Sequence, residues 1–486
     1  MRVALALLAV VVFCILPETA AAARISELTD SSMAERAVRF FTFQDPALRH
    51  ALVGSMLLGI CCGLMGAFLV VRKLALMGDA LSHAVLPGVA LGFLWHMSKD
   101  PLAIFVGATL AGLLGAGTVQ LIRNTTRHKE DAALGFVLAS FFGVGICLFT
   151  MIQNIPGGNK GGLDKFMFGQ AAALGRGDVL LLAVVTLLCV GVVFAFFKEF
   201  KLMSFDPGFA RSLGLPVQLF HYSLMLLLAF AIVSSLQAVG VVLVSAMLVI
   251  PAAAAFLLTD RFGGMLLLSA VFGLCAGAVG SFFSFVGRNL PTGPFMVLAA
   301  AAVFAAALFF GPRHGIVARW WRHRSRAARI QHENTLKAIY HVLENDGFRG
   351  ETISLAELAE RRRETLESAQ RQVKAARRSG FLTTMGDAVS LTPRGWQRAC
   401  EIVRNHRLWE LYLTNEARIA ADHVHEDAEV IEHALGEETV RKLERQLDYA
   451  RRDPHGKLIP GIRDIRRHEA GPPPGGRATG FGSPAA

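Results

Sequence analysis

Asp79 and His83 are two ionisable residues inside an otherwise apolar stretch, residues 73–95. Residues four apart on a helix project from the same face, so a helix here would hold the carboxylate and the imidazole about one turn apart. An aspartate at the centre of a membrane helix costs roughly 2.5–3.5 kcal/mol on insertion scales, so such residues commonly mark an ion or substrate path. Carboxylate oxygen and imidazole nitrogen also suit a first-row divalent cation. The pair therefore predicts a metal path.

Pro87 and Gly88 follow this pair directly, and they would break or kink the helix, as happens at transporter sites built on discontinuous helices. The alternative interpretation is that Asp79 caps a helix that begins after Gly78, and that His83 is a packing histidine with its hydrogen bonds satisfied. An isolated D-x-x-x-H pattern favours this alternative. The choice between the two interpretations depends on the surrounding sequence.

The surrounding sequence resembles the signature of the ABC-3 family, the manganese, zinc and iron ABC permeases. The resemblance covers residues 48–315, and its most specific stretches are 72–91, 201–216, 239–252 and 290–294. It implies a channel subunit that passes a divalent metal ion, Mn²⁺, Zn²⁺ or Fe²⁺, with Asp79 and His83 as the coordinating pair. It also implies a homo- or heterodimer of permease subunits that works with a cytoplasmic ATP-binding subunit and an external metal-binding protein.

The composition divides the chain into two parts. Of its 486 residues, 53% are hydrophobic, which is too many for an ordinary soluble protein, and the charged residues are concentrated after Gly311. A membrane domain followed by a soluble domain is the simplest account. The net charge of +11 suits either basic cytoplasmic loops or nucleic-acid binding. The seven cysteines have no CxxC spacing, so no disulfide framework is predicted.

Residues 1–23 have the pattern of a signal peptide, with an apolar run after Arg2 and an A-x-A-like site near Ala21. An uncleaved membrane anchor is the alternative, and residues 24–47 would form a short external segment. Apolar runs of membrane-spanning length follow in the predicted permease domain, residues 48–312. They lie at 48–71, 75–96, 102–122, 132–152, 178–198, 219–237, 239–258, 264–286 and 293–311.

An all-α, multi-pass domain in the inner membrane is therefore expected, with eight crossings as the alternative if one run is re-entrant. If the mature N-terminus is outside, nine crossings place every basic cluster in the cytoplasm, while residues 153–162 form an external loop. The clusters are Arg72–Lys73, Arg123–Lys129, Lys198–Arg211, Arg261 and the segment from Arg313. This topology puts Asp79 and His83 in the cytoplasmic half of the second span, so a mid-membrane metal site would need unwinding nearby.

The polar segment 199–217 lies on the predicted cytoplasmic side. Asp206-Pro207 is a helix-initiating pair, and in the ABC-3 family the matching stretch is the coupling helix that docks into the ATPase. The resemblance thus implies that Ser204, Phe205, Asp206 and Pro207 couple the chain to the ATPase; an ordinary amphipathic loop is the alternative. No G-x-x-x-x-G-K-[ST] motif occurs in the sequence. The motor must therefore be another subunit, with no ATP site in this chain, which is not expected to be an enzyme.

A strongly basic juxtamembrane linker, residues 313–331, carries Trp320 and Trp321, which suit a membrane interface with anionic lipid. Residues 332–398 predict a cytoplasmic winged helix-turn-helix. Its helices are expected at 335–343, 354–360 (with Ser354 as N-cap) and 364–379, followed by a two-stranded wing within 381–391.

The third of these helices carries Arg371, Lys374, Arg377 and Arg378. A basic face of this kind can contact DNA phosphates. A solvated face, or one attracted to anionic lipid, is the alternative.

Residues 399–460 resemble the metal-binding and dimerisation segment of diphtheria-toxin-repressor-type regulators, along 405–413, 424–433 and 453–456. The resemblance implies regulatory metal ligands at His406, Glu410, His425, Glu429, Glu432 and His433. Glu429, Glu432 and His433 share a helix face, and such mixed ligands suit Mn²⁺, Fe²⁺ or Zn²⁺. Glu429 stands where some iron sensors have cysteine, which favours manganese. A solvated acidic helix is the alternative.

Two residues depart from the pattern of the manganese sensors. Asn334 and Lys337 stand where those sensors have carboxylates, and a protonated lysine cannot ligate a metal. One metal site is therefore expected to be incomplete or lost. Residues 461–486, rich in proline and glycine, are expected to be disordered.

Three functions follow from these patterns. The first is the permease subunit of an ABC importer for a divalent transition metal, with a fused cytoplasmic metal-sensing domain. The second is a membrane-tethered, metal-dependent DNA-binding regulator with a vestigial permease. The third is an ABC permease for a metal chelate such as a siderophore. Asp79 and His83 favour the first over the third, because a bulky chelate needs no protein ligands for the bare metal.

Overall fold

A computed structural model of the chain describes residues 33–42, 46–96, 100–127, 129–155, 169–171, 174–287, 290–416, 419 and 436–461. The chain divides into two compact units, residues 1–319 and residues 320–486. Several predicted features lie outside the described residues. These are the signal peptide, most of the external loop at 153–162, the tail after Gly461 and the ligands His425, Glu429, Glu432 and His433.

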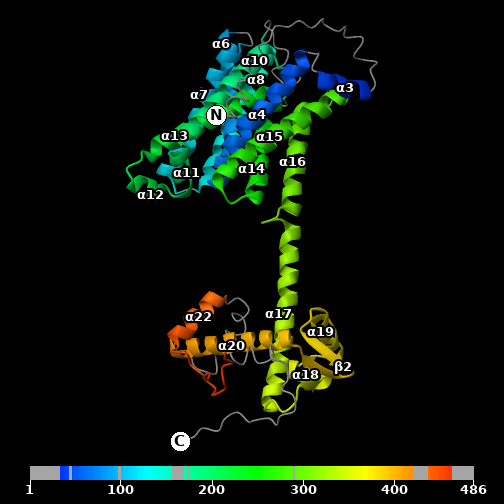
Figure 1. The fold of residues 1–486 in the computed structure, drawn as a ribbon. Helices are drawn as coiled ribbons and strands as arrows, with labels where there is room; N and C mark the ends of the chain where they lie inside the picture. Colours follow the sequence, from blue (N-terminus) through cyan, green and yellow to red (C-terminus); the bar gives the residue numbers. More distant parts are fainter. Residues whose placement is uncertain are drawn as a thin grey trace. The chain divides into compact units, whose positions relative to one another are not determined.

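The first unit is helical throughout its described residues (Figure 1). Nine segments there are long and apolar enough to cross a membrane, and they coincide with the nine predicted runs. The helices are α3 (Met33–Thr42), α4 (Pro46–Val71), α5 (Ala75–Ala84), α6 (Leu86–His96), α7 (Pro101–Thr125), α8 (Glu130–Asn154), α10 (Arg176–Ala195), α11 (Phe197–Phe205), α12 (Pro207–Ser212), α13 (Val217–Val239), α14 (Val241–Leu258), α15 (Phe262–Val286) and α16 (Thr292–Phe310).

Helix α4 packs along α15 and also contacts α14, α10 and α13. Small residues allow this close approach: a Cβ atom added at Gly59 would lie 2.0 Å from the carbonyl oxygen of Gly273 in α15. A Cβ added at Gly66 would lie 1.7 Å from the carbonyl oxygen of Leu248 in α14. Backbones that touch at glycine are typical of membrane helix packing, where van der Waals contact rather than the hydrophobic effect holds helices together. The glycines of this helix therefore allow its close packing against α15 and α14.

Apolar side chains cover the outer surfaces of several spans. Leu110 and Leu114 of α7, Val184 of α10 and Leu298 of α16 are exposed. A soluble protein rarely exposes such large apolar areas, so these surfaces fit a lipid environment.

Helices α13 and α14 are separated by a single residue, Gly240. Its backbone angles, φ 84° and ψ 158°, lie in a region that only glycine adopts readily. The backbone of Gly169 packs against this turn, and Gln170 N donates to the carbonyl oxygen of Gln237 at 2.9 Å. The turn thus depends on glycine at position 240.

The second unit contains a winged helix-turn-helix, as predicted. Its described elements are α17 (Ile316–Asn345, which begins in the first unit), β1 (Thr352–Ser354), α18 (Leu355–Arg362), α19 (Leu366–Arg378), β2 (Leu382–Met385), β3 (Ala388–Leu391), α20 (Pro393–Asn415) and α22 (Glu437–Gln446). The strands form an antiparallel sheet in the order β1-β3-β2, in which Val389 faces both Ile353 and Thr384.

Local signals set the boundaries of these elements. Ser354 and Glu357 form a capping box at the start of α18, and Gly380 follows α19 with φ 77°. The predicted N-cap at Ser354 is therefore confirmed. Strand β1 was not predicted, because three residues are too few for an alternating pattern. The helix α17 is longer than predicted and extends back through most of the basic linker.

Candidate metal site, coupling segment and metal-sensing unit

The turn before α5 fixes where this helix begins. Lys73 adopts a left-handed conformation (φ 58°), and the amides of Lys73 and Leu74 donate to the carbonyl oxygens of Val70 and Leu69. This bond pattern is a Schellman motif, which ends α4. Helix α5 starts directly afterwards at Ala75, with Leu74 as N-cap. Asp79 therefore lies inside the helix, and the alternative in which it caps a helix after Gly78 is wrong.

The second span is interrupted at Val85, between α5 and α6. Pro87 explains the interruption, because proline has no amide hydrogen to donate to the carbonyl group four residues earlier, that of His83. Just beyond the Asp79–His83 pair the helix is interrupted in its hydrogen bonding alone, because Val85 keeps right-handed helical angles (φ −78°, ψ −18°) and its amide donates to the carbonyl oxygen of Leu81. The interruption lies close to the midpoint of the span Ala75–Trp95.

Asp79 and His83 share one face of α5, as predicted. Their closest side-chain atoms, Oδ1 and Nε2, are 3.8 Å apart, and both side chains are partly buried. This distance is too long for a hydrogen bond, but two ligands that share one metal ion at bonds of about 2.0–2.2 Å lie roughly 3–4 Å apart. The His83 ring packs edge-to-face against Phe142 of α8, with centroids 5.0 Å apart.

One ring nitrogen of His83, Nδ1, is buried and makes no hydrogen bond within the described residues. The alternative of a packing histidine with satisfied hydrogen bonds therefore does not describe this side chain. The described part of the chain contains no group of three or more His, Cys, Asp or Glu residues arranged to hold a metal ion. A site with few protein ligands binds a metal ion weakly enough for the ion to leave again, as transport would require.

A polar contact that sequence analysis missed ties the end of α4 to α13. Arg72 donates through Nη2 to Nδ1 of His221 at 3.0 Å. Burial lowers the pKa of the Arg72 guanidinium, with Arg123 acting in the same direction and Glu130 against it. The feature of the sequence that pointed to this contact is His221, a histidine near the start of a predicted membrane span.

The predicted coupling segment joins two short helices, α11 and α12. Asp206 ends α11 and caps α12: its Oδ1 accepts from the amide of Phe209 at 2.9 Å, and Pro207 is the first residue of α12. The predicted helix-initiating pair is confirmed. Ser204 Oγ donates to the carbonyl oxygen of Phe200 at 2.7 Å, while Phe205 is exposed. Phe209 and Leu213 are exposed nearby, so the segment presents an apolar surface.

The basic face of α19 is exposed at each of its four predicted residues, Arg371, Lys374, Arg377 and Arg378. Arg377 Nη1 donates to Thr384 Oγ1 of the wing at 2.8 Å, which joins the helix to the sheet. The side chain of Met385, beside the tight turn at Gly386, is also exposed. This arrangement leaves the predicted DNA-binding surface accessible in the second unit.

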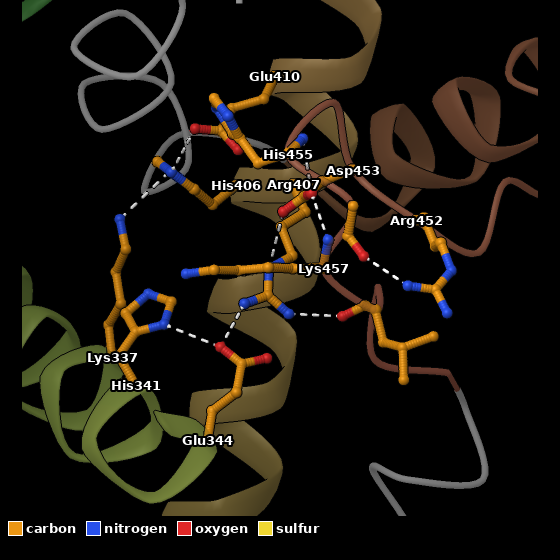
Figure 2. A network of polar contacts seen from close by, with 12 residues as sticks. Lys337, His341, Glu344, His406, Arg407, Glu410, Arg452, Asp453, His455 and Lys457 are labelled. Atoms are coloured by element: carbon orange, nitrogen blue, oxygen red, sulfur yellow. Dashed lines mark hydrogen bonds and ion pairs between the residues drawn. The ribbon is translucent and has the colours of Figure 1, made fainter. Parts of the chain in front are cut away.

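Two of the six predicted regulatory ligands lie in the described residues, and the structure brings them together on α20. His406 Nε2 and Glu410 Oε1 are 3.1 Å apart, and both side chains are buried (Figure 2). Lys337 of α17 reaches the same histidine, with Nζ 3.2 Å from Nδ1. The lysine that the sequence marked as a departure from the manganese sensors therefore lies in this cluster.

Arg407 forms a second buried cluster, which sequence analysis missed (Figure 2). Its Nη2 donates to Glu344 Oε2 at 2.6 Å, its Nη1 donates to the carbonyl oxygen of Leu458, and its Nε lies 3.4 Å from Asp453 Oδ2. Asp453 Oδ1 also accepts from the amides of His455 and Lys457. One buried guanidinium thus joins α17, α20 and residues 453–458.

Burial raises the pKa of the Glu344 carboxyl, but hydrogen bonds from His341 and Arg407, together with their positive charge, bring this pKa to about 2. A depressed folded-state pKa stabilises the fold above the unfolded value of 4.5, and this stabilisation disappears as pH falls toward about 2. The cluster is therefore intact at neutral pH.

Arg407→Ala is expected to destabilise the second unit by about 3–5 kcal/mol at pH 7, because it leaves the buried carboxylate of Asp453 and the partly buried carboxylate of Glu344 without their cation. Hydrogen exchange of the α20 amides in the full-length protein in urea measures this loss. The exposed Arg445→Ala on α22 is the control and should change stability by less than about 0.5 kcal/mol. Equal protection of α20 in both variants would contradict the assigned role.

The described residues contain nine helices long and apolar enough to cross a membrane, and the second of them carries the Asp79–His83 pair, which defines a multi-pass membrane protein. Residues 44–311 match the ABC 3 transport family (ABC-3), which is more than half of the chain, and the chain belongs to this family. Residues 392–461 match the metal-binding and dimerisation domain of iron-dependent repressors. The predicted combination of a transport permease with a repressor-type domain is confirmed. With nine crossings and the basic clusters inside, the repressor-type domain is cytoplasmic.

Two similar curated proteins are named as membrane proteins of metal transport systems. The chain is 35% identical over 378 residues to the manganese transport system membrane protein MntC of Bacillus subtilis, covering 78% of this chain and 86% of the relative. It is 38% identical over 291 residues to the zinc transport system membrane protein TroC of Treponema pallidum, covering 60% and 97%. Among solved structures, PsaBC from Streptococcus pneumoniae in complex with Fab matches at 34% identity and a TM-score of 0.53, covering 58% of this chain and 97% of that chain.

The match to the Bacillus subtilis protein is longer than the 319 residues of the first unit. It therefore includes part of the second unit as well.

Proposed function

We propose that this chain is the permease subunit of an inner-membrane ABC importer for a divalent transition metal, with Mn²⁺ as its first candidate and Zn²⁺ or Fe²⁺ as the others. The observation that carries this proposal is the Asp79–His83 pair, which lies on a membrane span. The helix of this span is interrupted at Val85, shortly after the pair and just before Pro87. The manganese and zinc names of the relatives support the class of substrate. Metal ions are cargo here, held briefly by these two side chains.

The proposed importer needs partners. The chain has no P-loop motif, so an ATP-binding subunit must supply the motor, and the exposed apolar segment around Phe205 is its proposed contact. Two permease subunits, as a homo- or heterodimer, would enclose the path, and an external binding protein would deliver the ion.

The cytoplasmic unit is proposed to sense metal and to restrain the transporter. The proposed ligands of this unit are His406, Glu410, His425, Glu429, Glu432 and His433. Covalent attachment gives the unit a high effective concentration near the transporter, so even a weak metal-dependent contact could close it. Metal binding can shift the equilibrium between the open and the closed transporter only by the difference between its binding free energies for these two states. This difference is typically about 1–3 kcal/mol.

Deleting residues 332–486, or combining Glu432→Ala with His433→Ala, is expected to raise uptake about 5- to 100-fold in metal-replete cells and to change little in starved cells. The measurement is the initial rate of radiolabelled Mn²⁺ uptake under both conditions. Arg445→Ala, which changes an exposed residue of α22 that is not a proposed ligand, is the control.

Unchanged uptake in both conditions, together with a metal-dependent footprint on promoter DNA, would favour a second candidate function. In that function the chain is a membrane-tethered regulator, and the exposed basic face of α19 contacts DNA. Neutralising Arg371 and Lys374 would then abolish the footprint.

Transport by cells tests the proposed substrate class. Cells that express the chain with its ATPase and external binding protein should accumulate free Mn²⁺ and should not accumulate a ferric siderophore. Uptake of the chelate without uptake of the free ion would support the chelate permease instead.

A further inference from the structure

Helix α3 (Met33–Thr42) precedes the first span and packs against the end of another. Its ten residues are too few to cross a membrane. The Phe40 side chain is buried, and its ring centroid lies 5.1 Å from that of Phe282 in α15. Arg36 Nη1 donates to the carbonyl oxygen of Val286, the last residue of α15, at 3.2 Å. These contacts fix α3 against the end of α15.

This end of α15 is on the external side of the membrane domain. With the mature N-terminus outside, nine crossings bring the eighth span, Phe262–Val286, to the outside at its last residue. Helix α4 starts the first span from the same side, and its first residue, Pro46, is four positions after Thr42. An extended chain covers at most about 3.6 Å per residue, so these two residues lie within about 15 Å of each other. Helix α3 is therefore at the outer boundary of the membrane, at the same end of the first unit as the start of α16 (Figure 1).

Helix α3 has two further sides besides the one that faces α15. Val38 and Phe41 are three positions apart, so they are neighbours on one side of the helix. Both are apolar, and they are 64% and 68% exposed. At 3.6 residues per turn, the polar residues Glu35, Arg39 and Thr42 occupy the remaining side. A helix with a protein-facing, an apolar and a polar side fits a boundary between protein, lipid and water.

The apolar side of α3 continues onto the outer surface of α15. The Phe41 ring centroid lies 5.9 Å from that of Phe282, and the Phe282 ring centroid lies 5.5 Å from that of Phe283. From Phe283, exposed residues recur along α15 at every fourth position, as one face of a helix requires. These residues are Phe283, Val279, Cys275, Val271 and Leu267.

The length of this exposed stripe on α15 indicates what covers it. At 1.5 Å per residue its sixteen steps extend over about 24 Å, which is most of the hydrocarbon thickness of about 30 Å. A charge-free stripe that follows a span for this distance fits lipid chains. Fully burying a valine or phenylalanine side chain contributes about 1.5–3 kcal/mol, so the same lipid would also stabilise the apolar side of α3.

We propose that α3 lies along the outer surface of the bilayer, with Val38 and Phe41 among the ends of the lipid chains and with Glu35 and Thr42 in water. The partner of this surface is the lipid of the outer leaflet, because the apolar side is continuous with a stripe that follows a whole span. Helix α3 then holds the start of α4 at the membrane surface. The inference does not depend on which ion the chain transports.

Photo-crosslinking tests this placement. The full-length chain is reconstituted in vesicles of phosphatidylethanolamine and phosphatidylglycerol, with the external binding protein added in excess. Phe41→benzoylphenylalanine and Val38→benzoylphenylalanine are each expected to form a covalent phospholipid adduct on illumination, which mass spectrometry of the α3 peptide detects. Thr42→benzoylphenylalanine is the matched control. Thr42 is the exposed neighbour of Phe41 on the polar side, and it should give at least about fivefold less lipid adduct.

Equal lipid adducts at Phe41 and Thr42 would overturn the proposal. Cross-links from Phe41 and Val38 to a second copy of the chain, or to the binding protein, in place of lipid would also overturn it, because the apolar side would then be a protein contact. Should the Val38 variant not fold, the Phe41 variant, which keeps an aromatic ring, still decides the outcome. Ion transport is not measured, so failure here is distinguishable from failure of the proposed function.

Discussion

Asp79→Ala and His83→Ala are each expected to reduce Mn²⁺ uptake by about two orders of magnitude while the protein still inserts and assembles. The two side chains are the proposed ligands on one face of α5, 3.8 Å apart, with a buried and unpartnered nitrogen on His83 within the described residues. Removing one of the two proposed ligands would cost about 3 kcal/mol of ion-binding free energy. Each 1.4 kcal/mol lowers the binding constant tenfold. Initial uptake rates of radiolabelled Mn²⁺ measure this loss.

Asp131→Ala is the matched control for the aspartate. Asp131 is an exposed carboxylate in the first turn of α8, outside the proposed path, so its loss should leave uptake within about twofold. Near-normal uptake by both Asp79→Ala and His83→Ala would rule out the assigned site.

Phe205→Ala and Asp206→Ala are expected to lower transport at least about tenfold without weakening metal binding. Phe205 is exposed, and its ring centroid lies 5.6 Å from that of Phe262 at the start of α15, so it connects the segment to a span. Asp206 caps α12, a helix of six residues, and losing such a cap costs about 1 kcal/mol. Reconstituted protein with its ATPase should then hydrolyse ATP without moving the ion.

The control for this prediction is Phe194→Ala, which removes an exposed phenylalanine near the end of α10, outside the coupling segment. This variant should transport normally. If Phe205→Ala and Asp206→Ala also transport normally and still copurify with the ATPase, the coupling segment lies elsewhere in the chain.

The features that sequence analysis predicted well are those with strong local signals. The nine apolar runs are each close to the length of a membrane crossing, so hydrophobicity alone indicates them. Pro87 predicts the interruption of the second span, because its missing amide affects the helix in any environment. Ser354 and Gly380 likewise mark helix ends through their own side-chain and backbone chemistry.

Contacts between distant segments were not predictable in the same way. Arg407 meets Glu344 and Asp453, which are 63 and 46 positions away, and no spacing rule connects them. The position of Lys337 shows the difference clearly. The sequence indicated that this lysine departs from a metal-site pattern, whereas its bond to His406 emerged only from the packing of α17 against α20. The assignment of His425, Glu429, Glu432 and His433 stays a prediction from resemblance, since these residues lie outside the described part of the chain.

The most direct test of the central claim is metal transport by the purified complex in lipid vesicles. The chain, its ATPase and the external binding protein are reconstituted, and accumulation of radiolabelled Mn²⁺ is followed with and without ATP. Unlabelled Mn²⁺, Zn²⁺, Fe²⁺ and a ferric siderophore are added in turn as competitors. We predict ATP-dependent accumulation that free divalent ions inhibit, that the chelate does not inhibit, and that Asp79→Ala abolishes. ATP hydrolysis without accumulation of any free divalent ion would contradict the assignment of this chain as a metal-ion permease.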